Sequence, residues 1–109
     1  MESNLEKLYI SKKDDVSQPD QASTGAYSRW LEGDGKRQRI VTYPKGYEAD
    51  HICYAGHSFY MIEGEIKKML GDEVTEWKEG DAFIIPDQIP HRVFNPFELD
   101  AKVVVTDNG

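Results

Sequence analysis

The residues best suited to chemistry are three histidines and one cysteine. His51 and His57 flank the only cysteine of the chain, Cys53, and His91 follows a turn bounded by two prolines at residues 86–90. Imidazole and thiolate are the ligands that zinc binds most often, and they also bind iron, nickel and copper. If residues 51–54 form a strand, His51 and Cys53 point to the same face, because side chains two residues apart do so. The spacing therefore allows a transition-metal site.

Each of these residues also has an ordinary structural role. A histidine in a β protein usually lies on the surface or forms a hydrogen bond with a neighbour, and a lone cysteine usually packs as a small apolar side chain. The spacing alone leaves the metal site and the structural interpretation open.

The elements that must position these residues are short strands. Glycine or proline separates apolar segments at nearly every junction after residue 25, and Asp34-Gly35 is typical of a hairpin turn. No later stretch has the long 3.6-residue apolar period of an amphipathic helix. We expect a single-domain, all-β jelly-roll β-barrel, with strands at residues 26–31, 39–43, 51–54, 58–62, 65–70, 74–78, 82–85, 91–94 and 101–106.

The first quarter of the chain has a different composition. Residues 11–25 contain one strongly apolar side chain, Val16, whereas residues 5–10 form a short apolar patch. We expect residues 1–25 to be an N-terminal arm or edge element and residues 26–109 to be the barrel domain. The patch would be an edge strand or a helical turn that docks on the barrel or on a partner chain.

Charge and composition exclude several classes of partner. Thirteen Lys and Arg against twenty Asp and Glu give a net charge of -7, which disfavours nucleic acid and anionic membranes as partners. The basic cluster Lys36, Arg37 and Arg39 lies among acidic residues and is expected to be a solvated hairpin. A single cysteine, no apolar leader and no membrane-spanning run predict a cytoplasmic protein.

The sequence resembles the first of the two motifs of the cupin superfamily, G-x5-H-x-H-x(3,4)-E-x6-G. Gly46, His51, Cys53, His57 and Gly64 occupy its positions in order, with the first gap one residue short. Cysteine stands in place of the second histidine, and histidine stands in place of the glutamate.

The second cupin motif, G-x5-P-x-G-x2-H-x3-N, is matched with its full spacing. Gly80, Pro86, His91 and Asn95 occupy their positions, and Gln88 replaces the middle glycine. Together the two motifs resemble those of small single-domain cupins, which implies the same jelly-roll barrel.

The resemblance also implies a ligand set. By position, His51, His57 and His91 would be metal ligands, and Cys53 would be a fourth ligand or would leave its place to water. Since a neutral imidazole replaces the usual carboxylate, the site would favour one divalent transition metal, iron, zinc or nickel, over magnesium or calcium. The alternative is that these replacements abolish metal binding.

A pocket beside the metal would be lined by inward-facing residues of the neighbouring strands. The candidates are Tyr43, Phe59, Met61, Val93 and Asn95, and the alternative is that they only pack the core. Alternation points Arg92 outward and does not place Arg29, Arg37 or Arg39. Since no Arg or Lys is identified as entering the pocket, a largely uncharged small molecule is the expected ligand or substrate.

Three functions fit this site. The first is a metal-dependent enzyme of oxygenase, lyase or isomerase type. The second is a non-catalytic sensor or accessory cupin that binds a small molecule or a metal, and the third is a structural barrel with vestigial ligands. By analogy with small cupins, we expect a homodimer.

Overall fold

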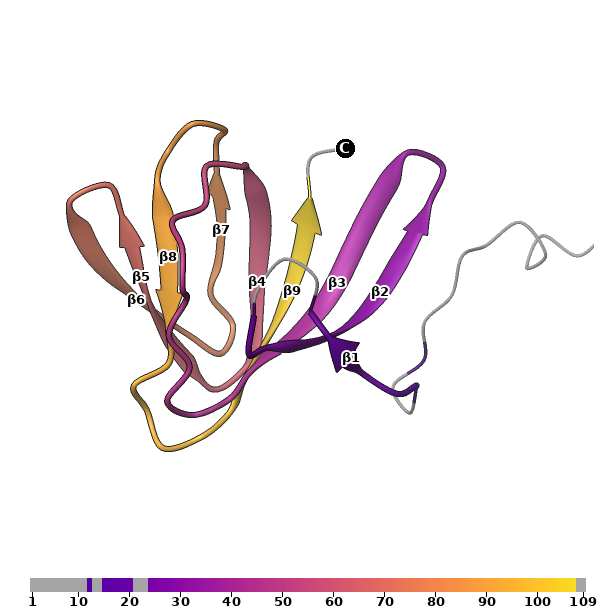
Figure 1. Cartoon of the computed structure of the whole chain (residues 1–109), viewed down its shortest axis with the longest axis horizontal. Helices are drawn as coiled ribbons and strands as arrows, with labels where there is room; N and C mark the ends of the chain where they lie inside the picture. The colour runs from indigo at the N-terminus through magenta and orange to yellow at the C-terminus, as the bar shows by residue number, and fades with distance from the viewer. Residues whose placement is uncertain (1–11, 13–14, 21–23, 108–109) are drawn as a thin grey trace, which may run out of the picture.

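The structure is a computed structural model that describes residues 12, 15–20 and 24–107. These residues form strands in two sheets and contain no helix, which confirms the expected all-β fold (Figure 1). The larger sheet has the order β1-β2-β3-β9-β4-β7 and the smaller one the order β6-β5-β8. The strand bounds are β1 Gln18–Pro19, β2 Tyr27–Gly33, β3 Lys36–Tyr43, β4 His57–Glu63, β5 Glu65–Leu70, β6 Glu73–Lys78, β7 Ala82–Ile85, β8 His91–Phe94 and β9 Ala101–Asp107.

Alternation of buried residues on β3 and β9 shows which face of the larger sheet lies inside. β3 buries Val41 and Tyr43, and β9 buries Val103 and Val105 on its matching face. Because β9 pairs with both β3 and β4, these side chains form continuous rows across the larger sheet. The core between the sheets consists of Ala26, Val41, Tyr43, Tyr47, Phe59, Met61, Ile66, Ile85, Val93, Ala101, Val103 and Val105.

Polar residues continue the same inward rows beyond the apolar core. His57 precedes Phe59 on β4, Asp107 follows Val105 on β9, and Arg39 precedes Val41 on β3, all three buried. Since His57 pairs with Asp107 in the β4–β9 register, the two side chains meet on the inner face. One end of the barrel is therefore polar inside.

The segment between β3 and β4 differs from the sequence prediction. Residues 51–54 are not a strand, and the segment touches β8 through two isolated bridges, Glu48 with Phe94 and Cys53 with His91. Residues 49–52 stand opposite only residues 92–93, so the extra residues loop out of the pairing and no continuous ladder forms. The prediction of a strand here was wrong, although Cys53 is still held against β8.

The N-terminal region is described only in part. β1 pairs with the start of β2, and Asp20, directly after β1, is buried. The apolar patch at residues 5–10 lies outside the described residues, so its predicted docking remains a prediction. Within the described part of the chain, no helix is long and apolar enough to cross a membrane.

Candidate metal centre

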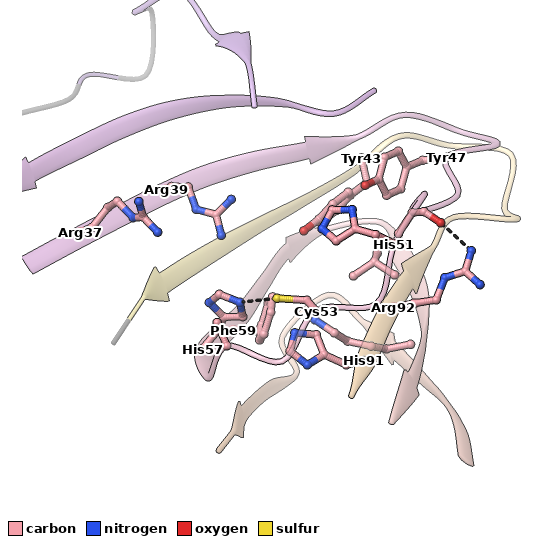
Figure 2. Close-up of a pocket in the computed structure, with 14 residues that line it drawn as sticks. Arg37, Arg39, Tyr43, Tyr47, His51, Cys53, His57, Phe59, His91 and Arg92 are labelled. Carbon is pink, nitrogen blue, oxygen red and sulfur yellow. Dashed lines mark hydrogen bonds between the residues drawn. The ribbon is translucent and has the colours of Figure 1, made fainter. Parts of the chain in front are cut away.

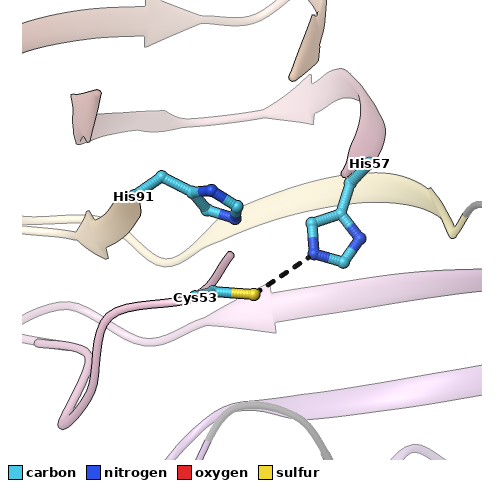
Figure 3. A group of neighbouring side chains, drawn as sticks. All are labelled: Cys53, His57 and His91. Carbon is cyan, nitrogen blue, oxygen red and sulfur yellow. Dashed lines mark hydrogen bonds between the residues drawn. The ribbon is translucent and has the colours of Figure 1, made fainter. Parts of the chain in front are cut away.

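Three of the four predicted ligands lie together inside the polar end of the barrel. One potential ligand atom each from Cys53, His57 and His91 lies within 4.8 Å of the other two (Figure 3). Both histidines are buried and Cys53 is half-buried. Cys53 Sγ is 3.6 Å from His57 Nε2. Thiolate and imidazole ligands on one tetrahedral zinc lie about 3.5 Å apart, given the usual bond lengths. The spacing of this donor set fits a metal ion.

Gly56 brings Cys53 and His57 to the same site. A Cβ atom at this position would lie 2.8 Å from the Asp87 backbone nitrogen and from the Ile85 carbonyl oxygen, which is closer than side chains tolerate. The Gly56 amide donates a 2.6 Å hydrogen bond to Asp87 Oδ1. The chain therefore turns tightly against the 86–90 turn, whose far end leads into His91.

His91 has one ring nitrogen engaged by the backbone. Its Nδ1 lies 2.9 Å from the Ile89 carbonyl oxygen, which can only accept, so Nδ1 carries the proton and Nε2 keeps its lone pair. Burial lowers the pKa of His91 to about 4, with the charges of Lys68 and His57 acting in the same direction against the Ile89 hydrogen bond. At neutral pH the ring is uncharged, as metal ligation requires.

His57 has a carboxylate behind it. Its Nδ1 is 2.5 Å from Asp107 Oδ1, while its Nε2 faces Cys53. Burial alone would raise the pKa of Asp107, but contacts with His57, Arg39 and Arg37 outweigh burial and hold the pKa well below its usual value. A carboxylate that orients a histidine from behind is the usual outer partner of a metal ligand. Sequence analysis missed Asp107, which the alternation of β9 could have placed inside.

Two arginines contact this carboxylate, and one of them, Arg39, links it to the N-terminal region. Arg39 Nε lies 3.1 Å from Asp107 Oδ2, and Arg39 Nη1 lies 2.9 Å from Asp20 Oδ2. Arg37 Nε lies 2.6 Å from Asp107 Oδ2. The expectation of a solvated basic cluster holds for exposed Lys36 but was wrong for Arg39, which is only 3% exposed, because alternation on β3 turns it inward.

His51 lies outside the group of three. Its exposed side chain contacts Asp50 through Nδ1 at 2.7 Å, on the part of the segment that loops out beside β8. It lines the same cavity nearer to Tyr43 and Tyr47 than to the ligand group (Figure 2). Its role as a ligand remains a prediction.

The ligand group opens into a cavity of about 210 Å³. That volume is below the roughly 300–1,000 Å³ of pockets for drug-sized ligands, so a small molecule fits it. Tyr43, Phe59 and Val93 line it, whereas Met61 is fully buried in the core and Asn95 donates to the Tyr43 and Leu99 carbonyls. The lining residues are Arg37, Arg39, Tyr43, Tyr47, Ala49, His51, Cys53, Ala55, His57, Phe59, Lys68, His91, Arg92 and Val93.

Four cationic residues line this cavity, and none of the described lining residues is acidic. They are Arg37, Arg39, Lys68 and Arg92 (Figure 2 labels the three arginines). The expectation that no Arg or Lys enters the pocket was therefore wrong. Arg37 and Arg39 lie on the inward face of β3, and Arg92 bends back to donate a 2.6 Å hydrogen bond to the Ala49 carbonyl.

Comparison with known families decides the classification. The family model described as "Cupin domain" matches residues 39–107, which contain both motifs and the whole ligand group. This chain belongs to the cupin family. The jelly-roll class is confirmed by solved cupins. A Cupin 2 conserved barrel domain protein from Salinispora arenicola is 13% identical, with a TM-score of 0.75 over 94% of this chain and 90% of that one.

Two proteins named for an enzymatic activity are also similar. The polyketide cyclase RemF from Streptomyces resistomycificus is 18% identical, with a TM-score of 0.77 over 90% of this chain and 76% of that one. A gentisate 1,2-dioxygenase from a Haloferax species is 45% identical over 42 residues, which are 38% of this chain. The aligned part is only 12% of the dioxygenase, so this cupin matches a short stretch of that relative.

Proposed function

We propose that this cupin is a metal-dependent enzyme acting on a small organic molecule, by oxygenase, lyase or isomerase chemistry. Cys53, His57 and His91 would hold one divalent transition metal, iron, zinc or nickel. The observation that carries the proposal is that one ligand atom each of Cys53, His57 and His91 lies within 4.8 Å of the other two. Ile89 and Asp107 lie against the Nδ1 atoms of the two histidines, which directs the Nε2 side of each ring to the ligand group.

The donor set favours these metals over harder ions. One thiolate and two imidazoles are soft or borderline ligands, which suit iron, zinc and nickel better than magnesium or calcium. Three protein ligands leave a coordination position for a substrate oxygen or water, as in catalytic rather than structural sites. When bound, such a metal supplies Lewis acidity or activates water.

The surrounding residues prepare the cavity for a substrate. Phe59 and Val93 give one part of the cavity wall an apolar surface beside Tyr43, and Asp107 lies behind the His57 ring. The similarity to a polyketide cyclase and to a dioxygenase supports an enzyme rather than a purely structural barrel.

Metal content tests this proposal first. We expect about one metal ion per chain in protein purified without an affinity tag, and a loss of it in His57→Ala and His91→Ala, measured by plasma mass spectrometry. His51→Ala, at an exposed histidine, is the comparison. Unchanged metal content in this variant would show that His51 is not a ligand, and a loss of metal would show that it is. Absence of metal after reconstitution with iron, zinc and nickel would contradict the proposal.

A second measurement tests the thiolate. Cobalt-substituted protein should show an intense near-ultraviolet charge-transfer band that Cys53→Ser removes, since thiolate ligation produces such bands. Iron in the native protein would direct assays to oxygen consumption with a substrate panel, and zinc or nickel would direct them to lyase and isomerase screens. Turnover that disappears with the metal distinguishes an enzyme from a sensor.

A further inference from the structure

Lys68 is a buried amine without a polar partner. It lies in the middle of β5, opposite Val93 of β8, and none of its surface is exposed. Among the described residues, its Nζ has no hydrogen-bond partner. The Nζ atom lies instead over an aromatic face, 3.4 Å from the centre of the Phe59 ring. The same Phe59 ring packs edge-on against His57, with centroids 5.6 Å apart. Lys68 therefore lines the cavity beside the ligand group.

The other cations of the cavity are already engaged. Arg39 contacts Asp20 and Asp107, Arg37 contacts Asp107, and Arg92 donates to the Ala49 carbonyl. Arg92 Nε is buried without a partner, but Arg92 is held through its Nη2 atom. Within the described lining, Lys68 is therefore the cationic side chain that has no hydrogen-bond or ion-pair partner for its charged group.

Keeping an amine in this place is unfavourable for the empty protein. Burial lowers the pKa of Lys68 well below its usual value, and the nearby Cys53 only partly counters that effect. A ring face stabilises an ammonium less than a carboxylate does. Ile66, its neighbour on the same inward face, shows that an apolar side chain would fit the pattern of the strand. Unsatisfied polar groups of this kind are typical of functional sites rather than of cores.

We propose that Lys68 binds an anionic oxygen of the substrate, and that the substrates of this site are small carboxylates. This inference rests on the proposed function, because it places the carboxylate in the cavity of the metal group. A carboxylate would accept the hydrogen bonds that Nζ donates and would meet a lining without acidic side chains. A second oxygen of the same molecule would be left to face Cys53, His57 and His91. The cavity of about 210 Å³ restricts the molecule to a small acid.

Matched acid and amide probes test the charge requirement. L-lactate with L-lactamide, pyruvate with pyruvamide, and benzoate with benzamide differ in each pair only in the carboxylate. Calorimetric titrations of zinc-loaded wild-type protein should show at least about tenfold tighter binding of the acid in one pair or more, the effect of one charge-assisted hydrogen bond. Absence of an acid preference in every pair would overturn the inference.

Two variants test Lys68 itself. Lys68→Met keeps the length of the side chain and should abolish the acid preference, with a much larger loss of affinity for the acids than for the amides. Lys67→Met is the control, because Lys67 is the adjacent residue, lies outside the cavity lining and ion-pairs with Glu76 on the strand β6. Acid binding by Lys68→Met at wild-type strength would overturn the inference. If Lys68→Met does not fold, Lys68→Gln, which keeps a donor without the charge, takes its place with the same expected loss.

The melting temperature gives a readout independent of turnover. The metal-free Lys68→Met protein should melt at a higher temperature than metal-free wild type, because a buried amine without a partner is removed. Carboxylates should raise the melting temperature of wild type and not of the variant. Metal content is measured in parallel. If the protein binds no metal but still binds acids through Lys68, the inference stands and the proposed function is refuted. If the protein contains metal but its acid binding does not depend on Lys68, the proposed function stands and the inference is refuted.

Discussion

The Nδ1 atoms of His57 and His91 each lie against an acceptor, so both rings direct their Nε2 side to the site. The two acceptors differ in charge. The Ile89 carbonyl engages His91, and the Asp107 carboxylate engages His57. A carboxylate increases the basicity of the imidazole that it orients, whereas a carbonyl mainly fixes its tautomer. His57 should therefore be the ligand whose affinity for metal depends more on its outer partner.

Replacing Asp107 by Asn tests this dependence. The amide keeps the size of the side chain but removes the charge that orients His57, so we expect metal affinity to fall by about 10–100-fold. Competition with a chromogenic chelator measures the affinity, and circular dichroism verifies that the variant is folded. Asp72→Asn, at an exposed turn position, is the control. Unchanged affinity in Asp107→Asn would show that the contact with His57 does not serve metal binding.

At this scale the sequence predicted the residues that the family motifs specify and missed those that the motifs leave out. The resemblance to the cupin motifs implied Cys53, His57 and His91 as ligands, and the structure places these three side chains together. Asp107 and Lys68 occupy no motif position, and they enter the site because β9 and β5 turn alternate residues inward. The expectation that His51 and Cys53 share a face came from a strand rule, which does not apply where the segment loops out.

At the scale of elements, two irregular segments hold the site. The segment of residues 44–56 and the turn at residues 86–90 carry Cys53 and lead into His91, and they are joined by a 2.8 Å hydrogen bond from the Gln88 amide to the Tyr54 carbonyl. Strand bounds such as 65–70 and 82–85 were predicted correctly because their turns have strong Gly and Pro signals. The irregular segment was not, because its shape depends on pairing with β8, which is remote in sequence.

Gln88 shows what the replaced motif glycine does. Its backbone has φ 73°, a left-handed conformation in which a side chain is strained. We expect Gln88→Gly to raise the free energy of unfolding by about 0.5–1 kcal/mol, since relief of strain exceeds the added entropy of the unfolded chain. Urea unfolding of metal-free protein measures this change.

The same substitution at Gln38 is the control for Gln88→Gly. Gln38 lies within β3, opposite Leu31 of β2, where the backbone is extended. Glycine there should lower the stability by about 0.5–1 kcal/mol. A loss of stability in both variants would show that the positive φ at Gln88 imposes no strain.

At the scale of the whole molecule, the charge is divided between surface and cavity. The chain carries a net charge of -7, yet the described lining of its cavity contains three arginines and one lysine and no carboxylate. Net charge governs solubility and encounters with large partners, whereas local side chains govern what a cavity binds. The acidic composition did not predict the positive charge of the cavity lining, because the alternation of residues along the strands determines which charged side chains lie inside.

The outer face of the larger sheet bears on the predicted homodimer. Tyr60 on β4 is 50% exposed, and Ile84 on the edge strand β7 is 74% exposed; both lie on this outer face. An apolar edge strand left open to water promotes association.

We expect light scattering after gel filtration to give twice the 12.5 kDa chain mass. Ile84→Lys should shift the mass toward a single chain, whereas Val74→Lys, 66% exposed on the smaller sheet, should not. A wild-type mass of one chain would refute the dimer, and an equal response of both variants would show that association does not depend on this face.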